Sequence, residues 1–291
     1  AGIIPSIVAM ARDGTIALAK AYAAHALMHL MFDNWANRVA IRQAGAYPIL
    51  VALVQNGTDL EKLYAAGALA KLAEEADQDL FRTSGAIAAI VELLRNGTPE
   101  QKDLAVQVVN WIGEQEQTFP HYREEARQQG ALPVLVAMVQ NGNALQKKYA
   151  VWALDQFASS YAAVIRTAGA FPALVTLLRD GTDEQKDSAA RALRNLELQE
   201  NTGAIRTTGG ISALLDLARD GTPDNSYQAI LHLNDLAQRT NQNVHAILAA
   251  GGVPILVELL GQTRNNAANV DDWIHLYTFA ETMANGGATA I

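Results

Sequence analysis

The chain has 291 residues, of which 50% are hydrophobic and only 6% aromatic, with 22 basic and 30 acidic side chains. The net charge of −8 argues against nucleic acid as a partner, because phosphate backbones require clustered positive charge. No cysteine is present, which excludes disulfides, cysteine-ligated zinc and thiol catalysis. No apolar run reaches about 18 residues, so we expect no transmembrane segment.

The first residues, AGIIPSIVAM, form an apolar stretch without an initial methionine. We expect a trimmed or processed chain, in which any targeting signal would have been upstream.

A glycine followed by an apolar segment recurs along the chain at intervals of 39 to 45 residues. These first glycines are Gly2, Gly45, Gly85, Gly130, Gly169, Gly209 and Gly251. In the first six units a second glycine follows 12 residues later, at Gly14, Gly57, Gly97, Gly142, Gly181 and Gly221. A fixed period of this length indicates a repeat protein.

Each repeat predicts the same local structure. A short amphipathic helix lies between the two glycines, as in AYPILVALVQN at 46–56, where proline occupies the first turn and its missing N–H is not needed. A longer helix follows the second glycine, and a capping box starts it: the pairs are Thr58 with Glu61, Thr98 with Gln101, and Thr182 with Gln185. A shorter helical piece precedes each first glycine, as in NRVAIRQAG at 37–45.

Two segments depart from this pattern. Residues 114–130 lengthen one connection between repeats. The last repeat replaces its second glycine region with GQTRNNAANVDD at 261–272, where we expect an exposed loop before a final helix from about Trp273.

A three-helix unit with glycine at its first corner and a long last helix resembles the armadillo repeat. The segments that carry the resemblance are AGAYPILVALV, SGAIAAIVELL, QGALPVLVAMV and AGAFPALVTLL, with ALAKLA, VVNWIG, ALDQFA and ALRNLE in the long helices. HEAT repeats are the nearest alternative, but they have two helices per unit and lack the short helix before each glycine.

The resemblance implies an all-α fold, a right-handed superhelical solenoid of about seven three-helix repeats. We expect a single solenoid over residues 1–291, with units at 1–36, 37–77, 78–117, 118–160, 161–200, 201–240 and 241–291.

The resemblance also implies that the long helices line a concave groove. Aligned on their ALxxLA cores, these helices carry columns of residues spaced three and four apart, which share one face. Tyrosine and tryptophan in these columns are the types that most often dominate binding energies, although an aromatic at helical spacing commonly belongs to the core between repeats. The candidate partner-binding residues are Tyr64, Lys71, Gln107, Trp111, Tyr149, Trp152, Gln156, Arg191, Asn195 and Asp235.

Armadillo proteins of the nuclear-import group clamp a basic peptide with a Trp and an Asn one turn apart on one helix. Here Trp152 is followed by Gln156, and Asn195 is preceded by Arg191. No repeat combines the pair, so we do not expect recognition of a nuclear-localisation peptide in this manner.

Catalytic patterns are sparse in this sequence. His25 and His29 form HxxxH, a spacing that can hold a metal on one helix turn, but no Glu follows the first His and no third ligand is evident. No GxSxG, GxGxxG or Walker-type loop is present, and the Gly-Thr pairs lack the following Lys that reaches a phosphate. We therefore expect no enzyme activity, no catalytic residues, no metal and no cofactor.

The sequence favours a non-enzymatic scaffold that binds another protein along the groove, as an extended peptide or a docked subunit. The alternative is a structural accessory subunit held permanently in a larger assembly. The resemblance favours an intracellular location, cytoplasmic or organellar, without fixing the compartment.

Overall fold

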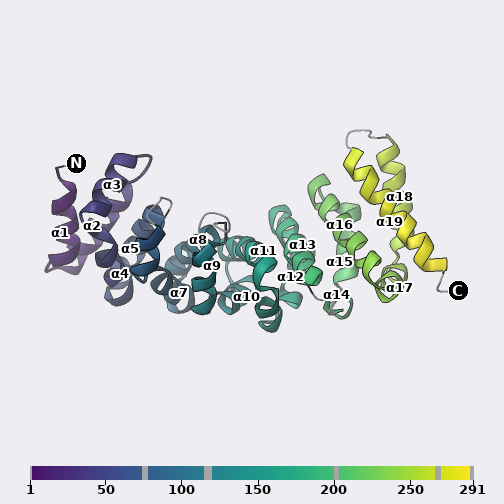
Figure 1. Ribbon diagram of the computed structural model, residues 1–291, viewed down its shortest axis with the longest axis horizontal. Coiled ribbons are helices and arrows are strands. Elements are labelled where there is room, and N and C mark those ends of the chain that lie inside the picture. Colours follow the sequence, from purple (N-terminus) through teal and green to yellow (C-terminus); the bar gives the residue numbers. More distant parts are fainter. Residues whose placement is uncertain (1, 74–77, 115–119, 200–202, 266–269, 289–291) are drawn as a thin grey trace. The chain divides into compact units, whose positions relative to one another are not determined.

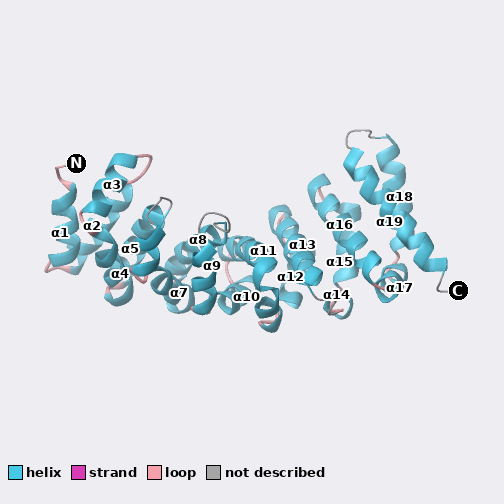
Figure 2. Ribbon diagram, in the orientation of Figure 1, coloured by secondary structure: helices cyan, strands magenta, loops and turns pink. Residues whose placement is uncertain are grey.

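The computed structural model describes residues 2–73, 78–114, 120–199, 203–265 and 270–288, and within these ranges the chain forms helices and turns but no strand (Figures 1 and 2). Its contacts define two compact units. Unit 1 comprises Ala1–Met138 and Asn143–Ala153, and unit 2 comprises Val139–Gly142 and Leu154–Ile291. The repeat boundaries given above stay predictions.

The helices of unit 1 follow one another in the predicted order of short, middle and long. They are α1 (Ile4–Asp13), α2 (Ala17–Leu30), α3 (Trp35–Gln43), α4 (Ala46–Asn56), α5 (Asp59–Ala73), α6 (Gln78–Thr83), α7 (Ala86–Asn96), α8 (Pro99–Glu114) and α9 (Pro120–Gln128). Two helices contribute residues to both units, namely α10 (Ala131–Asn141) and α11 (Ala144–Thr167).

The remaining helices belong to unit 2. They are α12 (Ala170–Asp180), α13 (Asp183–Gln199), α14 (Ala204–Thr207), α15 (Gly210–Asp220), α16 (Pro223–Arg239), α17 (Asn241–Ala249), α18 (Gly252–Asn265) and α19 (Val270–Ala288). Long helices of successive repeats pack on one another in each unit, as α2 does on α5 and α13 on α16.

The repeated glycines form two different corners. Gly169, ahead of α12, has φ 80°, a left-handed conformation that other residues adopt only with strain. Gly181, after α12, has an extended backbone, but a Cβ atom there would lie 2.6 Å from the Leu177 carbonyl oxygen. The first glycine is therefore required by conformation and the second by space, which explains their fixed spacing.

The predicted capping boxes are confirmed. The Glu61 carboxylate accepts from the Thr58 backbone N–H at 2.6 Å, and Gln185 accepts from the Thr182 N–H at 3.0 Å. The capping side chain can also bind the preceding repeat, because the Gln101 amide donates to the Asp59 carbonyl oxygen at 2.9 Å. One side chain thus starts its own helix and joins two repeats.

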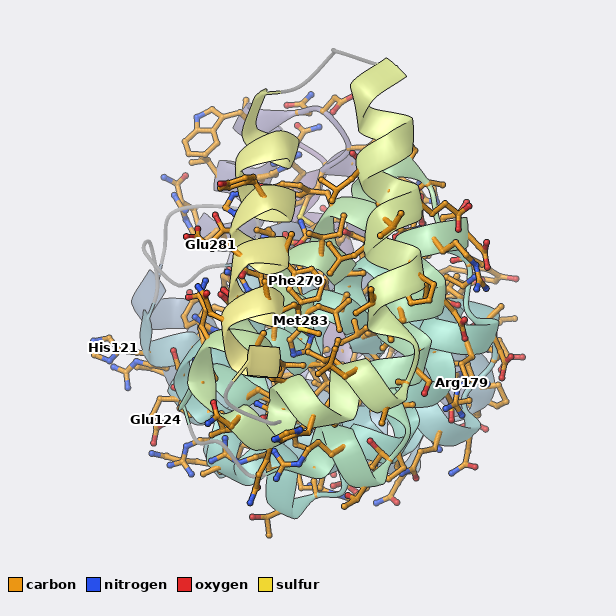
Figure 3. All side chains as sticks on the ribbon, turned by 90° about the vertical axis from the view of Figure 1, so that its right-hand side faces the viewer. His121, Glu124, Arg179, Phe279, Glu281 and Met283 are labelled. Carbon is orange, nitrogen blue, oxygen red and sulfur yellow. The ribbon has the colours of Figure 1, made fainter. Side chains whose placement is uncertain are left out.

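The core follows from helical periodicity. In α12, Leu174 and Leu178 are buried one turn apart, whereas Pro172 and Thr176 are exposed. Figure 3 shows the same alternation at α19, where Phe279 and Met283 point inward and are buried. Stacking of such faces buries the apolar surface that a single repeat would leave in water.

Two details differ from the sequence prediction. The expected loop at 261–272 is wrong in its bounds, because α18 continues to Asn265 and α19 starts at Val270; residues 266–269 lie outside the described ranges. No loop separates the fourth long helix from the next short one. Instead, α11 includes both the long helix and the short one. It is kinked at Tyr161, whose backbone is non-helical (φ −129°, ψ 29°).

In the described part of the chain, no helix by itself has both the length and the apolar composition needed to cross a membrane. Two bent pairs meet that criterion jointly, Ala144–Thr167 with Ala170–Asp180 and Asn241–Ala249 with Gly252–Gly261.

Candidate binding surface

Tyr64 on α5 packs against two side chains of α2. Its ring centroid lies 4.3 Å from that of His25 and 6.5 Å from that of Tyr22, which it stacks at an interplanar angle of 28°. Tyr22 is 54% exposed, and both Tyr64 and His25 are half-buried. The sequence-predicted Tyr64 is therefore the centre of a partly exposed aromatic cluster that joins two repeats.

A second aromatic cluster lies on α11. The Tyr149 and Trp152 rings meet edge to face with centroids 5.4 Å apart, and the Lys148 ammonium lies 4.6 Å from the centre of the Trp152 ring. All three side chains are half-buried. Aromatic pairs and cation–π contacts of this geometry hold rings in place without removing them from solvent.

We call Tyr22, His25, Tyr64, Tyr149 and Trp152 the aromatic surface of unit 1. Between its two clusters lies α8, which packs on α5 and is tied to α11 by the Gln146 amide, a donor to Asp103 at 2.7 Å. The members therefore sit on three long helices of one compact unit, α2, α5 and α11.

The other predicted residues of unit 1 are engaged differently. Trp111 packs on the buried rings of Phe81 (centroids 6.1 Å apart) and Tyr122 (6.0 Å), so it takes part in the contact between repeats. Gln107 donates to the Asp103 carbonyl oxygen of its own helix at 2.7 Å, and Lys71 is half-buried on α5.

In unit 2 the same columns carry a charged network. The Arg191 guanidinium donates to Asp155 at 2.8 Å and also pairs with Asp187, while the Asn195 amide reaches Asp155 at 3.5 Å. The Asp155 side chain is only 8% exposed. Burial raises the pKa of its carboxyl above the ordinary value, whereas Arg191 and Asn195 act to lower it.

Asp235 and Gln156 complete the predicted set. Asp235 on α16 accepts from Arg194 on α13 at 2.5 Å, which links two repeats, whereas Gln156 is exposed. The structure thus brings Arg191 and Asn195 together around Asp155, a residue that the sequence prediction missed. Its sequence signal is the carboxylate in the ALDQFA motif.

A buried histidine lies near this network. His232 on α16 is 1% exposed, and neither ring nitrogen has a hydrogen-bond partner among the described residues. Burial, together with the charges of Arg194 and Arg239, lowers the pKa of His232 to about 3. His232 is therefore a neutral core residue rather than a ligand.

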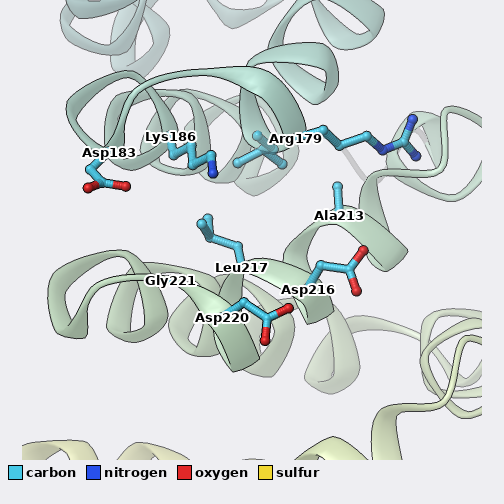
Figure 4. Close-up of a pocket in the computed structure, with 9 residues that line it drawn as sticks. Arg179, Asp183, Lys186, Ala213, Asp216, Leu217, Asp220 and Gly221 are labelled. Atoms are coloured by element: carbon cyan, nitrogen blue, oxygen red, sulfur yellow. The ribbon is translucent and has the colours of Figure 1, made fainter.

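Small-molecule sites, and metal sites built from three or more side chains, find little support in the described ranges. The cleft in Figure 4 is lined by charged side chains of α12, α13 and α15, namely Arg179, Asp183, Lys186, Asp216 and Asp220. Ligand pockets are usually enclosed and mainly apolar, unlike this cleft. No group of three or more His, Asp or Glu side chains in the described ranges is arranged to hold a metal ion.

Known proteins share this architecture. Residues 119–154 match the family model of the armadillo/beta-catenin-like repeat. An engineered protein whose crystal structure was determined by the Northeast Structural Genomics Consortium is 24% identical, with a TM-score of 0.78 over 97% of this chain and 68% of that chain. No curated protein matches the chain.

Two designed armadillo repeat proteins are also similar. One, solved in complex with the peptide (KR)4, is 23% identical with a TM-score of 0.69 over 81% of this chain and 99% of that chain. The other is 21% identical with a TM-score of 0.66 over 85% of this chain and 99% of that chain.

Fold and comparisons together define the class, an all-helical repeat solenoid. Residues 119–154 match the armadillo repeat, and the chain has the fold of the armadillo-repeat solenoids to which it is similar.

Proposed function

We propose that the chain is a non-enzymatic scaffold that binds an extended segment of another protein across the long helices of unit 1. The observation that carries this proposal is the aromatic surface, whose rings are fixed by mutual packing but remain partly exposed. The complex of a designed armadillo repeat protein with a peptide supports the same use of the fold.

Energetics favour this surface over the charged network of unit 2. Tyrosine and tryptophan lose little conformational entropy on binding, and such residues at the centre of an interface contribute about 2 kcal/mol or more each. Arg191 and Asp155 already satisfy each other, so a partner would have to break their pairing. We therefore expect a partner to gain more binding free energy on unit 1 than on unit 2.

Geometry limits the form of the partner. Packed helices lie about 8–10 Å apart, and an extended chain advances about 3.3 Å per residue. A peptide that crosses the long helices therefore places about three residues on each repeat. We expect the peptide to contact rings of the aromatic surface where it crosses α2, α5 and α11, and none where it crosses α8.

A selection experiment tests this proposal. Peptides are selected from a displayed library on the purified chain, and their affinities are measured for the Trp152→Ala and Trp35→Ala variants. Trp35 is the matched control because it is 56% exposed but begins the short helix α3. We expect Trp152→Ala to weaken the selected peptides by about tenfold or more and Trp35→Ala to leave them unchanged. Equal affinities for both variants would contradict the proposal.

A second candidate function is that of a permanently bound accessory subunit. The observation that favours it is the row of exposed apolar side chains on and beside α1 and α2: Ile3, Met10, Ile16 and Leu18, each at least 50% exposed. Cross-linking mass spectrometry on the native source distinguishes the two functions. Cross-links from the α1 region to one fixed neighbour favour the subunit, and cross-links from α5 and α11 favour the scaffold.

A further inference from the structure

Two histidines of α2 bring their ring nitrogens together at the surface. The Nε2 atoms of His25 and His29 share a hydrogen bond at 2.9 Å, which a metal ion would replace, and the rings meet at 89° with centroids separated by 4.4 Å. Spacing of four residues places both side chains on one face of the helix, one turn apart. His29 is exposed and His25 half-buried, so solvent reaches the pair.

This separation suits chelation. Imidazole nitrogens bind divalent transition metals at about 2.0–2.1 Å. Two such bonds at a right angle put the nitrogens about 2.9 Å apart, and a tetrahedral angle puts them at about 3.3 Å. The observed distance therefore matches adjacent ligands of a square-planar or octahedral ion, the geometries of Cu²⁺ and Ni²⁺.

The neighbouring repeat holds one of the two rings. Tyr64 of α5 packs on His25 at 4.3 Å between ring centroids, and Tyr22 stacks on Tyr64 at 6.5 Å. This support restricts the rotation of the His25 ring, which lowers the entropy lost when a metal binds. The other histidines lack this arrangement: His121 is exposed on α9, His245 is exposed on α17, His232 is buried, and His275 packs on Tyr227.

We propose that His25 and His29 form a two-histidine site for a divalent transition-metal ion such as Ni²⁺ or Cu²⁺. The described residues supply no third protein ligand, so water completes the coordination. The site does not depend on peptide binding by the aromatic surface, although it shares His25 with that surface.

Titration with Ni²⁺ alone tests the site. The full chain, free of any polyhistidine tag, is titrated by isothermal calorimetry. We expect saturable binding of one ion per chain, and no binding of Mg²⁺, which prefers oxygen ligands. His29→Ala is expected to weaken Ni²⁺ binding by at least about tenfold, because a single imidazole remains. His121→Ala, which removes an isolated exposed histidine, should leave binding unchanged.

Further variants separate ligation from folding. His25→Ala should also remove binding, and Tyr64→Ala should weaken it by a smaller factor, since Tyr64 only positions the His25 ring. The electron paramagnetic resonance spectrum of added Cu²⁺ should show coupling to two imidazole nitrogens. In His29→Ala it should show coupling to one. Absence of saturable Ni²⁺ binding to the unaltered chain, or unchanged binding to His29→Ala, would overturn the proposal.

Discussion

Equivalent repeat positions on the long helices of the two units carry side chains with different kinds of contact. In unit 1, Tyr64 and Trp152 contact mainly other rings and stay partly exposed. In unit 2, Arg191 and Asp235 are bound by charged partners on adjacent repeats. The rings leave apolar area exposed to solvent, whereas the ion pairs satisfy one another. A repeat column therefore predicts where a side chain lies but not whether it stabilises the fold or binds.

The largest expected effect concerns the charged network. Arg191→Ala leaves the buried Asp155 carboxylate with only the Asn195 amide, so we expect a loss of about 2 kcal/mol in the free energy of unfolding. This is below the usual cost of breaking a fully buried pair, because Arg191 is 40% exposed. Urea denaturation measures the change. The matched control is Arg12→Ala, whose pairing with Asp13 is fully exposed and should contribute nothing measurable.

Acidification should destabilise unit 2 through His232. Its folded pKa, about 3, lies below the ordinary value of 6.5, so the unfolded chain binds the proton more readily. The stability that neutral His232 provides is complete above pH 6.5 and is lost as the pH falls toward 3. As the pH falls from 7 to 5.5, we expect the free energy of unfolding to decrease by about 1 kcal/mol. The difference in unfolding free energy between the unaltered chain and His232→Leu should change by that amount, and a constant difference would contradict the assignment.

Helix caps should not distinguish the units. Asn34 accepts from the Asn37 N–H at 3.0 Å in unit 1, and Thr240 accepts from the Asn243 N–H at 3.2 Å in unit 2. Replacement of either cap by Ala should cost about 1 kcal/mol of unfolding free energy. Markedly unequal costs would show that the scaffold itself, rather than its surface, differs between the units.

Local features of the fold were predictable from the sequence because their causes lie within a few residues. The glycine corners depend on backbone conformation, and the boxes of Thr58 with Glu61 and Thr182 with Gln185 depend on a spacing of three. The sequence did not predict the kink at Tyr161, because no glycine or proline marks the point where the backbone of α11 becomes non-helical.

The candidate surface was only partly predictable. Alignment of the repeats selected Tyr64 and Trp152, but it could not show that Trp111 packs on Phe81 and Tyr122. The pairing of Asp155 with Arg191 joins residues 36 positions apart on adjacent repeats, and its strength depends on burial. Contacts between repeats therefore decide the role of each predicted residue, and a single repeat does not contain that information.

The most direct test measures the affinity of one selected peptide for Trp152→Ala and for Arg191→Ala. The measurement is made in buffer without urea, in which both variants are folded. We expect Trp152→Ala to bind the peptide about tenfold or more weakly, and Arg191→Ala to bind it as the unaltered chain does. Loss of affinity in Arg191→Ala with full affinity in Trp152→Ala would contradict the assignment of binding to unit 1.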